Sequence, residues 1–178
     1  ITISAKNIEL IGGVVVAGAG EEAIGNAGTI IVDTENLRIQ QEGEISVATR
    51  GKVNAGNLTI FARSLKLQDK GNISAETEDK ATGAAGTITI NAETIKLRNQ
   101  AKITVRATTK KSAGDLRINS NNIRIENQAE LIAETQAGDE GSITINNNKD
   151  LILRDNSKIT TNATGTATGG NITIKTEN

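Results

Sequence analysis

The chain has 178 residues, the usual size of one domain, and we treat residues 1–178 as a single domain. It contains no Pro, Cys, His, Met, Trp or Tyr and one Phe, so its core must be aliphatic, and thiol or imidazole metal sites are excluded. Lys and Arg number 20 and Asp and Glu 21, and the net charge of −1 gives no general attraction to nucleic acid or to an anionic membrane.

An apolar–x–apolar triplet opens the chain and recurs along its whole length. Its copies are 1–3, 30–32, 58–60, 88–90, 116–118, 143–145 and 172–174, with starts 27 to 30 residues apart. A second triplet follows seven residues later in five coils and eight later in the last, at 8–10, 37–39, 65–67, 95–97, 123–125 and 151–153. A third begins eight residues after the second, at 16–18, 45–47, 73–75, 103–105, 131–133 and 159–161. Among the flanking positions of these triplets only Gly18 and Thr161 are not apolar.

Alternation with period two is typical of half-buried strands, and the fixed repeat places each strand over its counterpart in the next coil. The pattern therefore predicts an all-β, single-stranded parallel β-helix of about six coils of 27–30 residues with three parallel sheets. We expect Leu37, Leu65, Ile95, Ile123 and Leu151 to form one column of its core. At a strand spacing of about 4.8 Å, six coils make a rod of roughly 29 Å.

The connections agree with this fold. Between the second and third triplets stand Gln41-Glu42-Gly43, Asp69-Lys70-Gly71, Asn99-Gln100-Ala101, Asn127-Gln128-Ala129 and Asp155-Asn156-Ser157. Asn and Asp tolerate positive φ, so these segments predict tight turns. Asn91, Asn119 and Asn146 occupy equivalent positions and predict an asparagine ladder. The arm that returns to the next coil varies in length and is rich in Gly, Ala and Thr.

The repeat resembles those of large exoproteins related to filamentous haemagglutinin, which are secreted by the two-partner route. The resemblance is carried by Gly170-Asn171-Ile172-Thr173-Ile174, by Leu65-Lys66-Leu67 and by Gly71-Asn72-Ile73-Ser74-Ala75, and the pattern covers essentially the whole chain. It implies a right-handed β-helix, a secreted or bacterial cell-surface location, and a role in adhesion or in a surface layer. The missing residue types leave an engineered, idealised solenoid scaffold as an alternative.

The leading hypothesis is a structural one: a rod or stalk segment of a large adhesin-type exoprotein. The chain opens with Ile1 rather than Met, and it begins and ends in a first triplet. We therefore expect a fragment of a longer repeat array, or self-association of uncapped ends into filaments. Partners on this hypothesis are a cell-surface glycan or receptor. No apolar run approaches the roughly 18 residues that span a bilayer, so membrane insertion is not expected.

The alternative function is a binding module for acidic polysaccharide. The outward residues of the second triplets are Glu9, Arg38, Lys66, Lys96, Arg124 and Ile152. Four consecutive cations, Arg38, Lys66, Lys96 and Arg124, predict a ladder for a polyanion, although neighbours such as Glu35 and Glu93 can offset them. The near-absence of aromatic residues argues against nucleic acid as a partner.

The other columns of outward-facing residues have simpler interpretations. Glu44, Lys102, Glu130 and Lys158, and likewise Glu76, Arg106 and Glu134, alternate in sign and indicate structural ion-pair ladders. A column of Thr2, Thr59, Thr89, Thr144 and Thr173 is broken by Ile31 and Arg117, which weakens an ice-binding interpretation. Asp33, Asp69, Asp115 and Asp155 fall at different places in the coil, so we expect no enzyme, and we expect neither metal nor cofactor.

Overall fold

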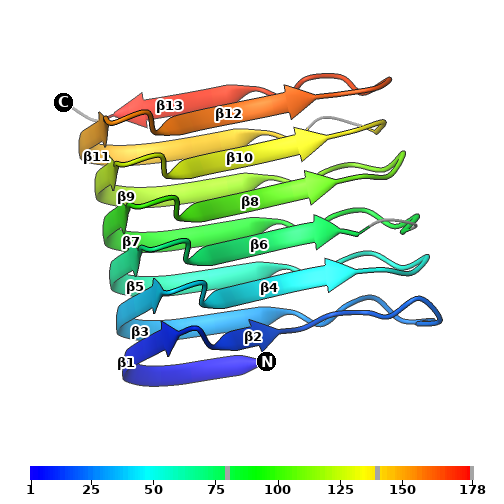
Figure 1. Cartoon of the computed structure of the whole chain (residues 1–178), viewed down its shortest axis with the longest axis horizontal. Helices are drawn as coiled ribbons and strands as arrows, with labels where there is room; N and C mark the ends of the chain where they lie inside the picture. The colour runs from blue at the N-terminus through cyan, green and yellow to red at the C-terminus, as the bar shows by residue number, and fades with distance from the viewer. Residues whose placement is uncertain (79–80, 139–140, 177–178) are drawn as a thin grey trace.

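The computed structural model describes residues 1–78, 81–138 and 141–176. Within these ranges the chain forms thirteen β-strands, which wind as stacked coils from one end of the molecule to the other (Figure 1). None of the described residues forms a helix long and apolar enough to cross a membrane. The fold is therefore an all-β parallel solenoid of about six turns.

The strands form two parallel sheets. The first consists of β1 (Thr2–Ile11), β3 (Ile30–Gln40), β5 (Leu58–Leu67), β7 (Ile88–Leu97), β9 (Leu116–Ile125), β11 (Ile143–Leu153) and β13 (Ile172–Thr176), in that order. The second consists of β2 (Val14–Val16), β4 (Glu44–Thr49), β6 (Asn72–Thr77), β8 (Lys102–Ala107), β10 (Glu130–Thr135) and β12 (Lys158–Ala163). Every neighbouring pair is parallel, as a coil that always winds the same way requires.

The prediction of three sheets is wrong, because the first and second triplets of a coil belong to one long strand. β3 runs unbroken from Ile30 to Gln40. It bends at Glu35, which is skipped by the register that pairs Thr34 and Asn36 with both neighbouring strands. The alternation of inward and outward side chains shifts by one residue at the bend. For this reason Ile30 and Leu37 are both buried although they are an odd number of residues apart. Hydrogen bonding continues on both sides of the bend, which joins the two segments into one sheet.

The third triplet of the first coil lies one residue earlier in the structure than the sequence pattern predicts. Val15, not Val16, pairs with Ile45 of β4. Val16 is 49% exposed, whereas Val15 and Ala17 pack against the core. The reason lies in the preceding turn, where two residues separate β1 from β2 while three separate β3 from β4. A turn shortened by one residue moves the inward-facing positions of the following strand by one.

The core is a continuous aliphatic column between the two sheets. The register places Leu37, Leu65, Ile95, Ile123 and Leu151 directly over one another. The first four are buried and Leu151 is partly buried. Ile, Leu, Val and Ala make up the whole of the main buried cluster. Since β-branched and aliphatic side chains stack well on pleated surfaces, this composition suits strands that pile identical positions.

The turns between the two sheets have the predicted character. Two consecutive residues have positive φ in each of five coils: Gln41-Glu42, Asp69-Lys70, Asn99-Gln100, Asn127-Gln128 and Asp155-Asn156. The following N–H closes each turn, as where Gly71 N donates to Gln68 O at 2.9 Å. Positive φ at both central residues with this closing bond is the signature of a type I′ turn, which favours Asn and Asp. The predicted tight turns are thus confirmed.

Glycines of successive return arms lie over one another in close backbone contact. A Cβ on Gly56 would collide with the carbonyl group of Gly28, and one on Gly86 with that of Gly56. The same close approach recurs where Gly170 lies over Gly141. Only glycine lets one backbone come this near another, which explains why the return arms end in Gly although they differ in length.

The core column predicts that substitutions at neighbouring residues of one strand change the free energy of unfolding by very different amounts. Leu65→Ala should lower the free energy of unfolding by about 2–5 kcal/mol, because it opens a cavity in a fully buried site. Lys66→Ala, on the exposed side of the same strand, should change it by at most about 0.5 kcal/mol. Urea unfolding followed by circular dichroism measures both, and equal effects would contradict the assignment of the two faces.

Candidate functional site

The predicted cationic column lies on the outer face of the long strands, after the bend. The register stacks Glu9, Arg38, Lys66, Lys96, Arg124 and Ile152 in that order. Arg38 Nη1 lies 3.5 Å from Glu9 Oε1, and Arg124 Nε lies 3.4 Å from Glu126 Oε1. In the described ranges no carboxylate forms an ion pair with Lys66 or Lys96. The middle of the column therefore keeps two ammonium charges without a direct counter-charge.

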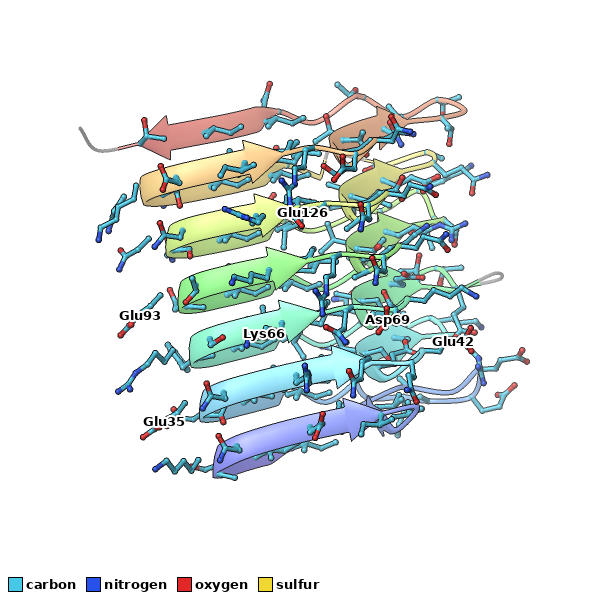
Figure 2. All side chains as sticks on the ribbon, turned by 60° about the vertical axis from the view of Figure 1, so that its left-hand side comes forward. Glu35, Glu42, Lys66, Asp69, Glu93 and Glu126 are labelled. Atoms are coloured by element: carbon cyan, nitrogen blue, oxygen red, sulfur yellow. The ribbon has the colours of Figure 1, made fainter. Side chains whose placement is uncertain are left out.

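The two carboxylates expected to offset this column stand elsewhere. Glu35 and Glu93 project from the bend of the coil, whereas Lys66 lies across the face of its strand (Figure 2). Glu35 is the residue at which the register skips, and Glu93 is its equivalent in β7. Neither forms an ion pair with Arg38 or Lys96, so these two glutamates do not neutralise the column by contact.

A second column, which the sequence reasoning missed, forms the other wall of a groove beside the cations. It contains Gln40, Gln68, Arg98, Glu126 and Arg154. Arg98 donates two hydrogen bonds to Gln68 Oε1, at 3.1 Å from Nε and 2.6 Å from Nη2. The groove has a volume of about 280 Å³ and adds Arg98 to the four predicted cations. Arg98 lies two residues after Lys96, so strand alternation alone would have placed it on the same outer face.

Glu126 limits the cationic groove at its upper end. Its Oε1 lies 2.9 Å from Arg154 Nη2 and 3.4 Å from Arg124 Nε. That oxygen is buried and accepts no well-oriented hydrogen bond, so its attraction to the two guanidinium groups is one of charge rather than of directed bonding. The positive potential is thus concentrated lower in the groove, around Lys66, Lys96 and Arg98.

The outer face of the second sheet carries the predicted ladders of alternating charge. Lys102 Nζ lies 3.2 Å from Glu130 Oε2, and Arg106 Nε lies 3.7 Å from Glu134 Oε2. The first ladder is interrupted, because Asn72 stands between the positions of Glu44 and Lys102. These pairs are partly exposed, and each stabilises the fold by at most a few tenths of a kcal/mol.

Glu76, on this face, is a titratable group whose pKa is shifted by its surroundings. Burial raises the pKa of its carboxyl group, the nearby Arg106 guanidinium lowers it, and the carboxylates of Glu44, Glu134 and Glu78 raise it further. Although the register places Arg106 opposite Glu76, the ion pair that Arg106 forms is with Glu134. The net effect raises the pKa of Glu76, so the ionised carboxylate is less favourable in the fold than in the unfolded chain.

Amide ladders run along two other edges of the coil. The predicted one forms: Asn119 Nδ2 donates to Asn91 Oδ1 at 2.7 Å, and Asn146 Nδ2 donates to Asn119 Oδ1 at 2.8 Å. Another lies on the turns, where Asn99 Nδ2 donates to Asp69 Oδ1 at 2.7 Å and Asn127 Nδ2 donates to Asn99 Oδ1 at 3.0 Å. The turns border an open hollow of about 620 Å³, at the edge where Figure 2 labels Asp69 and Glu42.

The acidic residues considered for metal binding or catalysis do not gather at one place in the described part of the chain. Groups of three or more acidic side chains that could hold a cation do not occur there. Asp69 and Asp155 lie in turns three coils apart, and Asp115 pairs with Arg117 at 2.8 Å. The threonine column is in register but broken by Ile31 and Arg117, as its sequence indicated. The described surface thus offers grooves along the rod rather than a cleft.

The chain was compared with known proteins at three levels. No model of a protein family matches it, no curated protein matches it, and no solved structure matches it. Its relation to any family therefore stays a matter of sequence pattern.

Glu76 gives a pH-dependent prediction. A carboxyl whose pKa is raised in the fold stabilises it below the unfolded pKa, about 4.3, and that contribution is lost as the pH rises through the folded pKa. Glu76→Gln should therefore raise the melting temperature at pH 7 and change it little at pH 3. Glu134→Gln, which removes an ion-paired carboxylate, is the matched control and should not stabilise the protein. Thermal unfolding at the two pH values checks this; a Glu76→Gln effect that is larger at pH 3 would contradict it.

Proposed function

We propose that this chain is a rigid spacer, a rod or stalk segment that holds other parts of a larger exoprotein away from a surface. The observation that carries the proposal is the unbroken stacking of both sheets over one aliphatic core through all the described coils. Such a stack resists bending, because any tilt between coils must stretch parallel ladders on two sides at once. Among the described residues, no three acidic side chains gather into a group that could hold a metal ion.

Contacts between coils are reinforced outside the strands. The turns bond to each other, as where Lys70 N donates to Asn99 O at 2.9 Å. The return arms do so too, with Ala55 N donating to Ala84 O at 2.9 Å. Successive coils are therefore joined around most of their perimeter, which is the mechanical property that a spacer needs.

The parent of such a segment, on this proposal, is a secreted or cell-surface adhesin of the filamentous haemagglutinin type, with a right-handed coil. The support is the repeat itself, in particular Gly170-Asn171-Ile172-Thr173-Ile174 and Gly71-Asn72-Ile73-Ser74-Ala75. A right-handed crossover between parallel strands also agrees with the general preference of such connections.

Rigid spacing can be measured directly, since the chain has no cysteine of its own. Spin labels on Glu9→Cys and Ile152→Cys mark two ends of one column. Five steps of about 4.8 Å separate their backbones by about 24 Å. Double electron–electron resonance should give a narrow distance distribution, because the coils do not move relative to one another.

Removal of one coil provides the control. Deleting residues 88–115 joins equivalent positions, because Ile88 pairs with Leu116. The distance between the labels should then fall by about 4.8 Å without broadening. A broad distribution in the intact chain, or a separation that the deletion leaves unchanged, would rule out a rigid rod.

A second function, binding of an acidic polysaccharide, is favoured by the cationic groove. Lys66 and Lys96 lack ion-pair partners among the described residues, and Arg98 adds a further cation beside them. Cations at strand spacing along the rod match the repeated charges of a linear polyanion, and binding of this kind weakens as salt screens it.

Heparin, a sulfated polysaccharide, is the probe. The intact chain should be retained on heparin resin at low salt and released as salt rises, and replacement of Arg38, Lys66, Lys96 and Arg124 by Ser should abolish retention. The matched control replaces Lys70, Lys102, Arg106 and Lys158, which removes the same charge from other surfaces and should preserve retention. An intact chain that passes through at low salt would leave the inert rod as the function.

A further inference from the structure

A longitudinal groove runs along the bend of the long strands. Two adjoining hollows of about 400 Å³ each share Ala62 and Glu93, so together they follow the bend from the first coil to the last. Small side chains lie at its base, at Ala62, Ala92 and Ser120. The residues that the register skips, such as Glu35 and Glu93, form its outer wall and project from the bend in Figure 2.

The two halves of this groove differ in charge. The lower half is lined by side chains of both signs, including Lys6, Asp33, Glu35 and Arg63. The upper half has a single charged residue, Glu93, among nine lining residues. Its other polar groups are five asparagines and a serine: Asn91, Asn119, Asn121, Asn146, Asn148 and Ser120.

The asparagines of the upper half stand in two hydrogen-bonded ladders on opposite walls. Asn91, Asn119 and Asn146 form the inner one, at 2.7 and 2.8 Å. On the outer wall Asn148 Nδ2 donates to Asn121 Oδ1 at 3.0 Å. A primary amide has two N–H donors and two carbonyl lone pairs, and a ladder bond uses one of each. Each wall therefore holds its amides in fixed orientation and leaves a donor and an acceptor at every rung.

Phe61 marks the lower end of this amide surface. It is the only aromatic residue of the chain, and it is 46% exposed although the core is wholly aliphatic. The register places it in the same column as the inner ladder, directly beside Asn91. An apolar ring that stands in water next to a row of oriented amides is the surface from which a ligand with both apolar faces and hydroxyl groups gains most.

We propose that the upper half of the bend groove, with Phe61 at its end, binds a linear uncharged polysaccharide lying along the rod. The ring of Phe61 would pack on the apolar face of one sugar, and the amides of Asn91, Asn119 and Asn146 would exchange hydrogen bonds with hydroxyl groups of the next ones. An uncharged chain fits because the amides carry no net charge, and a polyanion would meet the carboxylate of Glu93. This site is separate from the cationic groove and goes beyond the spacer role.

We expect the ligand to be a polymer of short repeating units, because the asparagines that line the groove recur once in every coil. Successive rungs are spaced by one strand, about 4.8 Å, which is close to the length of one pyranose unit in an extended chain. A peptide would instead present alternating side chains, for which the shallow base of Ala62, Ala92 and Ser120 offers no separate pockets.

The test uses linear hexasaccharides of β-1,4-glucose, β-1,4-mannose and α-1,4-glucose as probes, with NMR of the side-chain amides as the readout. At least one should shift the Asn91, Asn119 and Asn146 signals in a saturable way. Phe61→Ser and Asn119→Ala should each weaken that binding by roughly two- to tenfold, the effect of one lost contact. Both positions are exposed, so circular dichroism should show an intact fold.

The matched control is Asn36→Ala, which removes an exposed ladder amide, bonded to Asn7 at 2.8 Å, from the same sheet but outside the groove. Its binding should equal that of the intact chain. If none of the three sugars shifts the groove amides, or if Asn36→Ala weakens binding as much as Asn119→Ala, the proposal is overturned. It is also overturned if an uncharged Gly-Ser peptide shifts these amides and the sugars do not.

Discussion

The structure depends on one constraint: residues one coil apart must lie directly over one another in parallel register. A slip by a single residue would turn every aliphatic side chain of a strand toward water. Variation in coil length is accordingly confined to places that leave the inward triplets aligned. The first coil shortens a turn, and the last coil inserts a residue at the bend, where the register shifts between Asn147 and Asp150. There Asn147 is buried with both polar side-chain atoms unpartnered, which is a cost of that insertion.

The same constraint turns each outward position into a ladder. A neutral amide gains from repetition, because Asn119 donates to one neighbour and accepts from another. A charge gains only when its neighbour has the opposite sign, as for Lys102 and Glu130. A column of like charges is therefore unfavourable in the free protein. Lys66 and Lys96 stack as two like charges in register, and the proposed binding of a polyanion rests on this pair.

The shape also restricts what the molecule can bind. The hollows run along the axis of the rod, at the turns, beside the cations and at the bend. A groove that repeats every coil favours an extended polymer over a compact ligand. Spacing and binding are compatible roles, since a rigid rod presents its ladders at fixed intervals whether or not they are occupied.

The sequence by itself determined the period, the parallel stacking, the aliphatic core, the tight turns and the Asn91 ladder, because each follows from which residues recur at equivalent positions. Only the tertiary structure decided that there are two sheets, that Val15 rather than Val16 faces inward, and that a groove runs along the bend of the long strands. The physical reason is that alternation reports which side of a strand is buried. It does not report whether hydrogen bonding continues around a bend, and the sheets, the walls and the grooves all depend on that bend.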